Sequence, residues 1–116
     1  MGLKTLYVDE EIYIEANIKR IRSKDYKNFT ELVIKMWNIF FEHNIQSKGY
    51  SAVKKKHVPT TEMRRTSIKI PKALEEKIDN YLNKFTNEEM YAEEQSFSQI
   101  TNELISRFYI IGEKYF

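Results

Sequence analysis

One pattern occurs twice in this chain of 116 residues, and the repetition restricts the folds that the chain can adopt. A short strand-like segment, 3–8, precedes two amphipathic helical segments, and the same order returns from residue 65. A lone strand cannot satisfy its backbone hydrogen bonds, whereas two strands can pair with each other. We therefore expect residues 3–8 and 65–70 to form a two-stranded antiparallel ribbon, with four helices packed on its apolar side.

The first copy carries two helix-start signals. Asp9 is the expected N-cap of a helix that continues to about Ser23. Asn28 and the glutamate three residues later form a capping-box pattern that opens a second helix. The first helix is expected to bury a stripe of Ile14, Ile18 and Ile21. The apolar positions of the second helix, expected to be core, are Phe29, Leu32, Val33, Met36, Trp37, Phe40 and Phe41.

The second copy repeats these features. The strand Thr66–Ile70 alternates apolar with polar residues, and Pro71 stands where a helix start tolerates proline. A polar, acidic break is expected from Thr86 to Gln95, and Ser96 begins another capping box. The apolar positions of the two helices are Leu74, Ile78, Leu82 and Phe85, then Ile100, Leu104, Ile105 and Phe108.

The clearest sign of duplication is a match between two helix starts. Phe29-Thr30-Glu31-Leu32 corresponds to Phe97-Ser98-Gln99-Ile100 at an offset of 68 residues. The alternative is chance similarity between amphipathic helices. We divide the chain into a first repeat, 1–43, a basic linker, 44–64, and a second repeat, 65–116, and we expect the repeats to fold together as one domain.

Composition narrows the classes of protein. The chain has no cysteine, which excludes disulfides and thiolate nucleophiles. No apolar run approaches the ~18 residues of a membrane span, and the N-terminus lacks a signal-peptide pattern. We therefore expect a cytoplasmic protein that does not bind membranes.

Positive charge is concentrated in the middle of the chain. Residues 44–65 carry six basic side chains and one acidic, whereas residues 66–116 carry six basic and nine acidic. The run Lys54, Lys55, Lys56 and His57 is either a solvated linker or a segment that follows a nucleic-acid backbone.

Each copy has the order strand, helix, capped turn, helix, and the strands of the two copies are expected to pair. This arrangement resembles the ribbon-helix-helix proteins of the Arc/MetJ/CopG family. The resemblance rests mainly on Arg65-Thr66-Ser67-Ile68-Lys69-Ile70-Pro71 and on the helix start after Ser96. It implies a mainly α fold with a two-stranded antiparallel β-ribbon, in which the two repeats form a pseudo-dimer within one chain. Tandem forms resemble small regulators of crenarchaeal viruses, for which the host cytoplasm would be the location.

The resemblance also implies a mechanism, in which the ribbon enters the major groove of double-stranded DNA. By motif, the outward residues of the second strand, Arg65, Ser67 and Lys69, would read base edges. The first strand would present Leu3, Thr5 and Tyr7, and Leu3 either meets a thymine methyl or indicates that this half reads little. Because the two strands differ, an imperfect palindrome is the expected binding site. The alternative for these positions is an ordinary exposed ribbon face.

The second class of contact implied by the resemblance is with phosphate. Free N–H groups at a helix start favour an anion, and plain capping is compatible with that role. The phosphate-binding residues would be Asn28, Phe29 and Thr30 at one helix start and Ser96, Phe97 and Ser98 at the other. The positive charge of the linker separately suggests phosphate contacts by Lys54, Lys55, Lys56 and Arg64.

The sequence gives little support to other functions. It has no glycine-rich phosphate loop and no convincing acid–base pair, so we expect neither an enzyme nor a cofactor. His43 and His57 have no nearby ligand cluster, so we expect no metal. A protein-interaction module with the same fold, such as an antitoxin-like protein or an assembly adaptor, is the alternative. The apolar C-terminal end, 108–111 with Tyr115 and Phe116, either folds onto the chain's own core or supports self-association on DNA.

Overall fold

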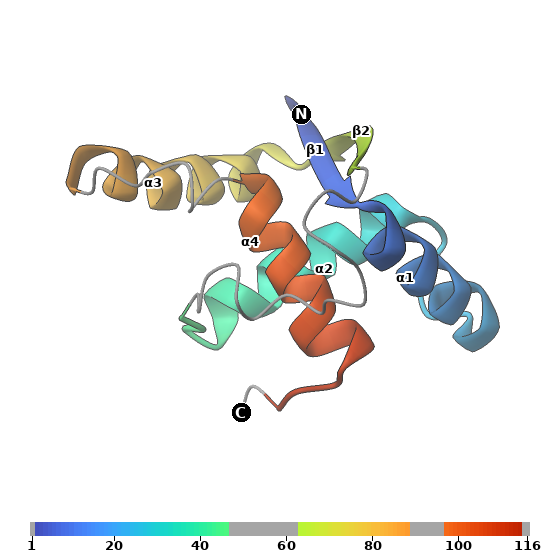
Figure 1. Ribbon diagram of the computed structural model, residues 1–116. Helices are drawn as coiled ribbons and strands as arrows, with labels where there is room; N and C mark the ends of the chain where they lie inside the picture. Colours follow the sequence, from blue (N-terminus) through green and yellow to red (C-terminus); the bar gives the residue numbers. More distant parts are fainter. Residues whose placement is uncertain (1, 47–62, 89–96, 115–116) are drawn as a thin grey trace.

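The computed structural model describes residues 2–46, 63–88 and 97–114 (Figure 1). It is mainly helical and contains one two-stranded antiparallel sheet, as predicted. The elements are β1 (Gly2–Asp9), α1 (Glu10–Ser23), α2 (Phe29–Glu42), β2 (Met63–Ile70), α3 (Lys72–Glu88), α4 (Phe97–Leu104) and the π-helical turn η3 (Ile105–Ile110).

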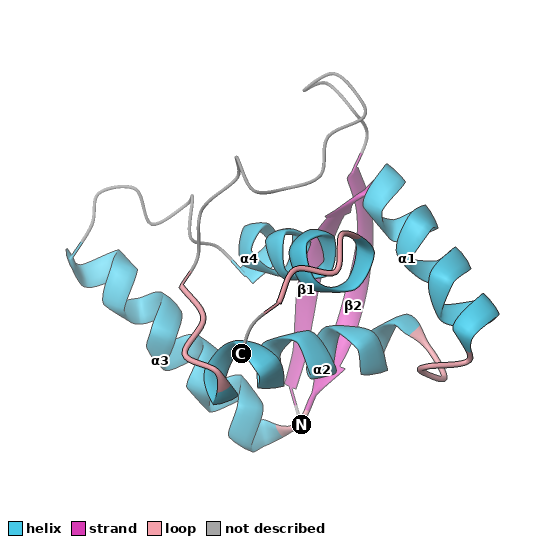
Figure 2. Cartoon of the chain, turned by 90° about the horizontal axis from the view of Figure 1, so that it is seen from below, coloured by secondary structure: helices cyan, strands magenta, loops and turns pink. Residues whose placement is uncertain are grey.

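The ribbon pairs β1 with β2 from Gly2 opposite Ile70 to Asp9 opposite Met63. Side chains alternate across a strand, so one face of the ribbon is apolar and packs on the helices. Leu6, Val8, Ile68 and Ile70 on this face are at most 1% exposed. Seen from below, α2 and α4 cross beneath both strands, α4 toward one end and α2 toward the other (Figure 2). The predicted pairing of residues 3–8 with 65–70 is confirmed.

Two predicted N-caps are also confirmed. The Asp9 Oδ1 accepts hydrogen bonds from the backbone N–H of Glu11 at 3.0 Å and of Ile12 at 3.2 Å. The Asn28 Oδ1 accepts from the Glu31 N–H at 2.9 Å. The Glu31 carboxylate accepts from the Lys27 N–H at 3.3 Å, so the return half of this capping box is displaced by one residue. Ser96, the third predicted cap, lies outside the described residues.

The predicted buried stripe of α1 is wrong. Ile14, Ile18 and Ile21 are 47%, 45% and 63% exposed, and the helix buries Ile12 and Ala16 instead. Each residue turns a helix by about 100°, so Ile14 lies about 200° around the axis from Ile12, on the far side. No residue separates the end of β1 at Asp9 from the start of α1 at Glu10. This direct connection limits how α1 can turn about its axis, and so which of its sides faces the core.

The predicted break after α3 begins later than expected. The helix continues to Glu88, so residues 86–88 are helical rather than part of the break. Polar residues alone do not end a helix, and neither glycine nor proline occurs in residues 86–88. Leu74 and Ile78 are buried, as predicted, whereas the side chain of Phe85 lies outside the described set.

The core is centred on α4 and η3, which pack against β1, α1 and α2. Trp37 is fully buried, as predicted, and its ring stacks on that of Phe97 with centroids 5.7 Å apart. Its indole N–H donates to the Thr101 hydroxyl at 2.9 Å. The core residues predicted for α4 and η3 are buried too, namely Ile100, Leu104, Ile105 and Phe108.

Part of the apolar C-terminal end folds onto the chain itself. Phe108 and Tyr109 are buried, while Ile111 is 57% exposed. The Tyr109 hydroxyl donates to the Asp25 carboxylate at 3.0 Å, and burial followed by this hydrogen bond raises the pKa of Tyr109 to about 12. The described part of this end therefore belongs mostly to the core, and Tyr115 and Phe116 lie outside the described residues.

A buried ion-pair network lies where α4 continues into η3. The Arg107 guanidinium donates to Glu103 at 2.8 Å and to Glu113 at 2.9 Å. The side chains of Arg107 and Glu103 are only 7% and 1% exposed. Burial lowers the pKa of Arg107, but the hydrogen bonds to Glu113 and Glu103 outweigh it and the pKa is raised. The network thus neutralises a charge that the helix places inside the core.

We predict that Arg107→Met lowers the free energy of unfolding by about 3 kcal/mol, because Glu103 stays buried without its cation. Adding Glu103→Gln to this variant should recover part of the loss, since no buried charge then remains unpaired. Urea unfolding of the single and double variants measures both effects. Equal stability of the two variants would show that the buried carboxylate is not the source of the loss.

Candidate nucleic-acid interface

The outward face of the ribbon carries all six residues predicted to read bases. Each is exposed, with Leu3 at 72% and Tyr7 at 47%. The strand register places them in three cross-strand pairs, which are Leu3 opposite Lys69, Thr5 opposite Ser67 and Tyr7 opposite Arg65. The helices lie on the other side of the ribbon (Figure 1). The structure therefore brings the six side chains together on one face.

The positive charge on this outward face lies on one strand. Both cations, Arg65 and Lys69, stand on β2, and the β1 residue opposite each of them is apolar or aromatic. Within the described parts of the chain, neither cation forms an ion pair. Their charges are thus available to a ligand, while β1 offers the methyl groups of Leu3 and the ring of Tyr7 beside them.

Arg64 lies on the ribbon's other face, next to the start of α1. Its guanidinium forms two hydrogen bonds with the Glu10 carboxylate, at 3.0 and 3.2 Å. It also lies over the Tyr13 ring, 4.6 Å from the centroid. The hydrogen bond and charge of Glu10 raise the pKa of Arg64. A phosphate contact by this residue, which the sequence predicts, would have to share the guanidinium with Glu10.

The two predicted phosphate-binding helix starts lie on opposite sides of the ribbon (Figure 2). At the start of α2, Asn28 caps the Glu31 N–H, and Phe29 and Thr30 are the first two helical residues. Their N–H groups have no acceptor within the described residues. A helix start with free N–H groups and a positive dipole end is a general site for an anion.

The start of α4 is bound to the ribbon itself. The Ser98 hydroxyl, a predicted phosphate ligand, accepts a hydrogen bond from the Tyr7 N–H at 2.9 Å. Phe97 is buried against Trp37, so only its backbone could contact an anion. Ser96 and the basic run Lys54, Lys55 and Lys56 lie outside the described residues.

Sequence reasoning missed Asn102, which joins α4 to β1. Its amide oxygen accepts from the Asp9 N–H at 2.9 Å. Its amide nitrogen donates to the Tyr7 carbonyl at 3.0 Å and to the Ser98 carbonyl at 2.8 Å. The residue is 2% exposed. The only signal in the sequence is a polar residue one helical turn after Ser98, and that pattern equally fits a solvated helix face.

Other kinds of site find little support in the part of the chain that the structure describes. It contains no group of three or more histidine or acidic side chains placed to hold a metal. None of its helices combines the length and the apolar character needed to cross a membrane. No protein-family model, curated protein or solved structure matches the chain.

We predict that Asn102→Ala lowers the free energy of unfolding by about 2 kcal/mol, because it leaves buried backbone groups of Tyr7 and Asp9 without partners. Hydrogen exchange of the Asp9 amide should accelerate in the same variant. Urea unfolding and amide exchange by NMR measure the two effects. Asn80→Ala, at an exposed position of α3, is the control and should leave both unchanged. A loss no larger than the control's would contradict the role of Asn102.

Proposed function

We propose that this protein is a sequence-specific DNA-binding regulator of transcription, which inserts the β1–β2 ribbon into the major groove. The observation that carries the proposal is the outward face of the ribbon, where six exposed side chains include two cations that form no ion pair with any described residue. The major groove, about 12 Å wide, admits a two-stranded ribbon and presents a different donor and acceptor pattern for each base pair.

Each outward residue has a defined role in this proposal. Arg65 donates two hydrogen bonds to the acceptors of a guanine, and Lys69 donates to the same kind of edge. Ser67 and Thr5, paired at the centre of the ribbon, form single hydrogen bonds with bases or phosphate. Leu3 and Tyr7 contact the methyl groups of thymine. The first copy thus reads by apolar contact and the second by hydrogen bonding.

The proposal includes the tandem ribbon-helix-helix arrangement. The element order and the antiparallel pairing of β1 with β2 support it, because the second strand, two helices after the first, completes the ribbon that the family builds from two chains. The start of α2 then contacts the DNA backbone on one side of the ribbon and the start of α4 on the other. The two unequal strands bind an imperfect palindrome.

The amino-acid content of β1 also favours a second function, binding to another protein. Leu3 and Tyr7 are exposed apolar or aromatic side chains, which are enriched in protein interfaces. In that case the ribbon would serve an adaptor or antitoxin-like protein. DNA binding distinguishes the two functions, because only the first requires sequence-dependent affinity for duplex DNA.

We predict that selection from a random duplex pool yields a preferred site, and that Arg65→Ala combined with Lys69→Ala weakens binding to it by about a hundredfold. Fluorescence anisotropy at fixed salt concentration measures the affinity. Lys35→Ala with Lys114→Ala is the control, because it removes the same charge from exposed positions outside the ribbon. The control should weaken binding much less.

A second readout tests the unequal halves. Repeating the selection with Arg65→Ala alone should relax base preference in one half of the site and leave the other half unchanged. Equal losses for the ribbon and control variants would contradict reading by the ribbon. Failure of every duplex to bind would contradict DNA binding and leave the protein-binding alternative.

A further inference from the structure

The outward side of α1 is an apolar stripe on the surface. Ile14, Ile18 and Ile21 are spaced by four and three residues, and each is at least 45% exposed. This spacing aligns side chains along one narrow line of a helix, as in the seam of a coiled coil. The inward side of the same helix separately buries Ile12 and Ala16. The stripe is therefore additional to the surface that holds the helix in the fold.

The equivalent positions of α3 carry no such stripe. Both helices follow a ribbon strand, and α1 begins at Glu10 and α3 at Lys72. Counted from these starts, the positions of Ile14, Ile18 and Ile21 are occupied in α3 by Glu76, Asn80 and Asn83. All three of these residues are exposed and polar. The exposed isoleucines are thus a feature of α1 that α3 does not share.

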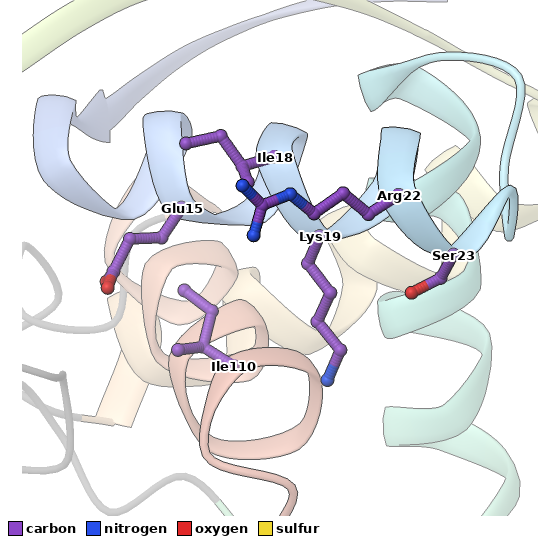
Figure 3. A pocket seen from close by; sticks show the side chains of 6 residues that line it. All are labelled: Glu15, Ile18, Lys19, Arg22, Ser23 and Ile110. Carbon is purple, nitrogen blue, oxygen red and sulfur yellow. The ribbon is translucent and has the colours of Figure 1, made fainter.

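The stripe continues into a groove between α1 and the C-terminal end of η3. The groove has a volume of about 390 Å³, and Ile18 and Ile110 line it together (Figure 3). Glu15, Lys19 and Arg22 also line it, and the Arg22 side chain runs back along α1 so that its guanidinium lies beside Ile18 (Figure 3). Ile111, the residue after Ile110, is 57% exposed. The apolar surface therefore extends from one helix to its neighbour.

The charged residues beside the stripe indicate which molecule would pack on it. Glu15 and Arg22 are seven residues apart, so they lie on the same side of α1, two turns from each other. A second α1 in antiparallel orientation would place Glu15 opposite Arg22 of the partner subunit, and the reverse pair would form by symmetry. A parallel arrangement would place like charges at the same level. Glu15 and Arg22 are thus complementary to the same two residues of a second, antiparallel copy, while Lys19, which would lie near its own copy, donates to the Tyr109 carbonyl at 2.6 Å.

From these observations we propose that α1 is a self-association surface, which packs in antiparallel orientation on α1 of a second copy of this chain. Ile18 lies near the two-fold axis, and Ile14 and Ile21 extend the contact on either side. Ile110 and Ile111 border it. The interface is isologous and leaves the outward face of the ribbon free. It does not depend on DNA, so it can be tested without DNA.

Sedimentation velocity of the full chain, from micromolar to millimolar concentration, should show a monomer–dimer equilibrium. Ile18→Asp should weaken association by about tenfold or more, because it buries an unpaired carboxylate. Asn80→Asp, at the corresponding position of α3, is the matched control and should leave association unchanged. Urea unfolding of each variant shows whether the fold is intact.

Charge reversal tests the orientation. Glu15→Arg alone and Arg22→Glu alone each place like charges opposite each other and should weaken the dimer. The two changes together restore opposite charges and should recover it. Failure of the combined variant to recover association would overturn the antiparallel pairing.

Two other outcomes would overturn the proposal. One is a wild-type chain that stays monomeric throughout the concentration range; strong destabilisation by Ile18→Asp would then show that the chain covers the stripe itself. The second is a dimer unaffected by Ile18→Asp, which would place the interface elsewhere. Loss of DNA binding would not affect any of these results.

Discussion

Backbone hydrogen bonds between β1 and β2 join the start of the chain to residues 63–70, and the other contacts depend on that pairing. A two-stranded ribbon is marginal alone and needs a hydrophobic support on one face. Leu6, Val8, Ile68 and Ile70 supply the apolar side of that contact, and α2 and α4 supply the support. Because side chains alternate, this choice also decides which residues point outward. Core packing therefore sets the candidate reading face.

Polar as well as apolar contacts hold α4 on the ribbon. Ser98 and Asn102 bind the backbone of β1 near Tyr7, so the start of α4 and the end of the ribbon form one unit. Further along, Glu103 at the end of α4 and Arg107 in η3 compensate each other's charge. If DNA docks on the ribbon, the helix start therefore meets the backbone in a fixed position. Preorganisation of this kind lowers the entropic cost of binding.

Much of the fold could be predicted from the sequence where one local signal dominates. Alternation revealed both strands, and Asp9 and Asn28 marked two helix starts through short-range capping. The six outward residues followed from the alternation of side chains along each strand.

The stripe of α1 was predicted wrongly because the helix is apolar on two sides, and periodicity does not say which side faces the core. Asn102, Glu103 and Arg107 could not be found, because their burial depends on how α4 packs against β1 and α2 and η3 packs against α1 and α2, which is a tertiary property. The later end of α3 shows that a polar segment without glycine or proline is a weak stop signal.

The two halves of the chain differ most on their surfaces. Seven large hydrophobic side chains are exposed in the described residues, and five of them, Leu3, Tyr7, Ile14, Ile18 and Ile21, belong to β1 and α1. At the corresponding places the second half carries cations on β2 and polar residues on α3. In the two proposals above, the second half makes contacts by hydrogen bonding and charge, and the first half makes apolar contacts. A single chain can make this separation because its two strands and helices vary independently, whereas a dimer of identical chains must present the same surface twice.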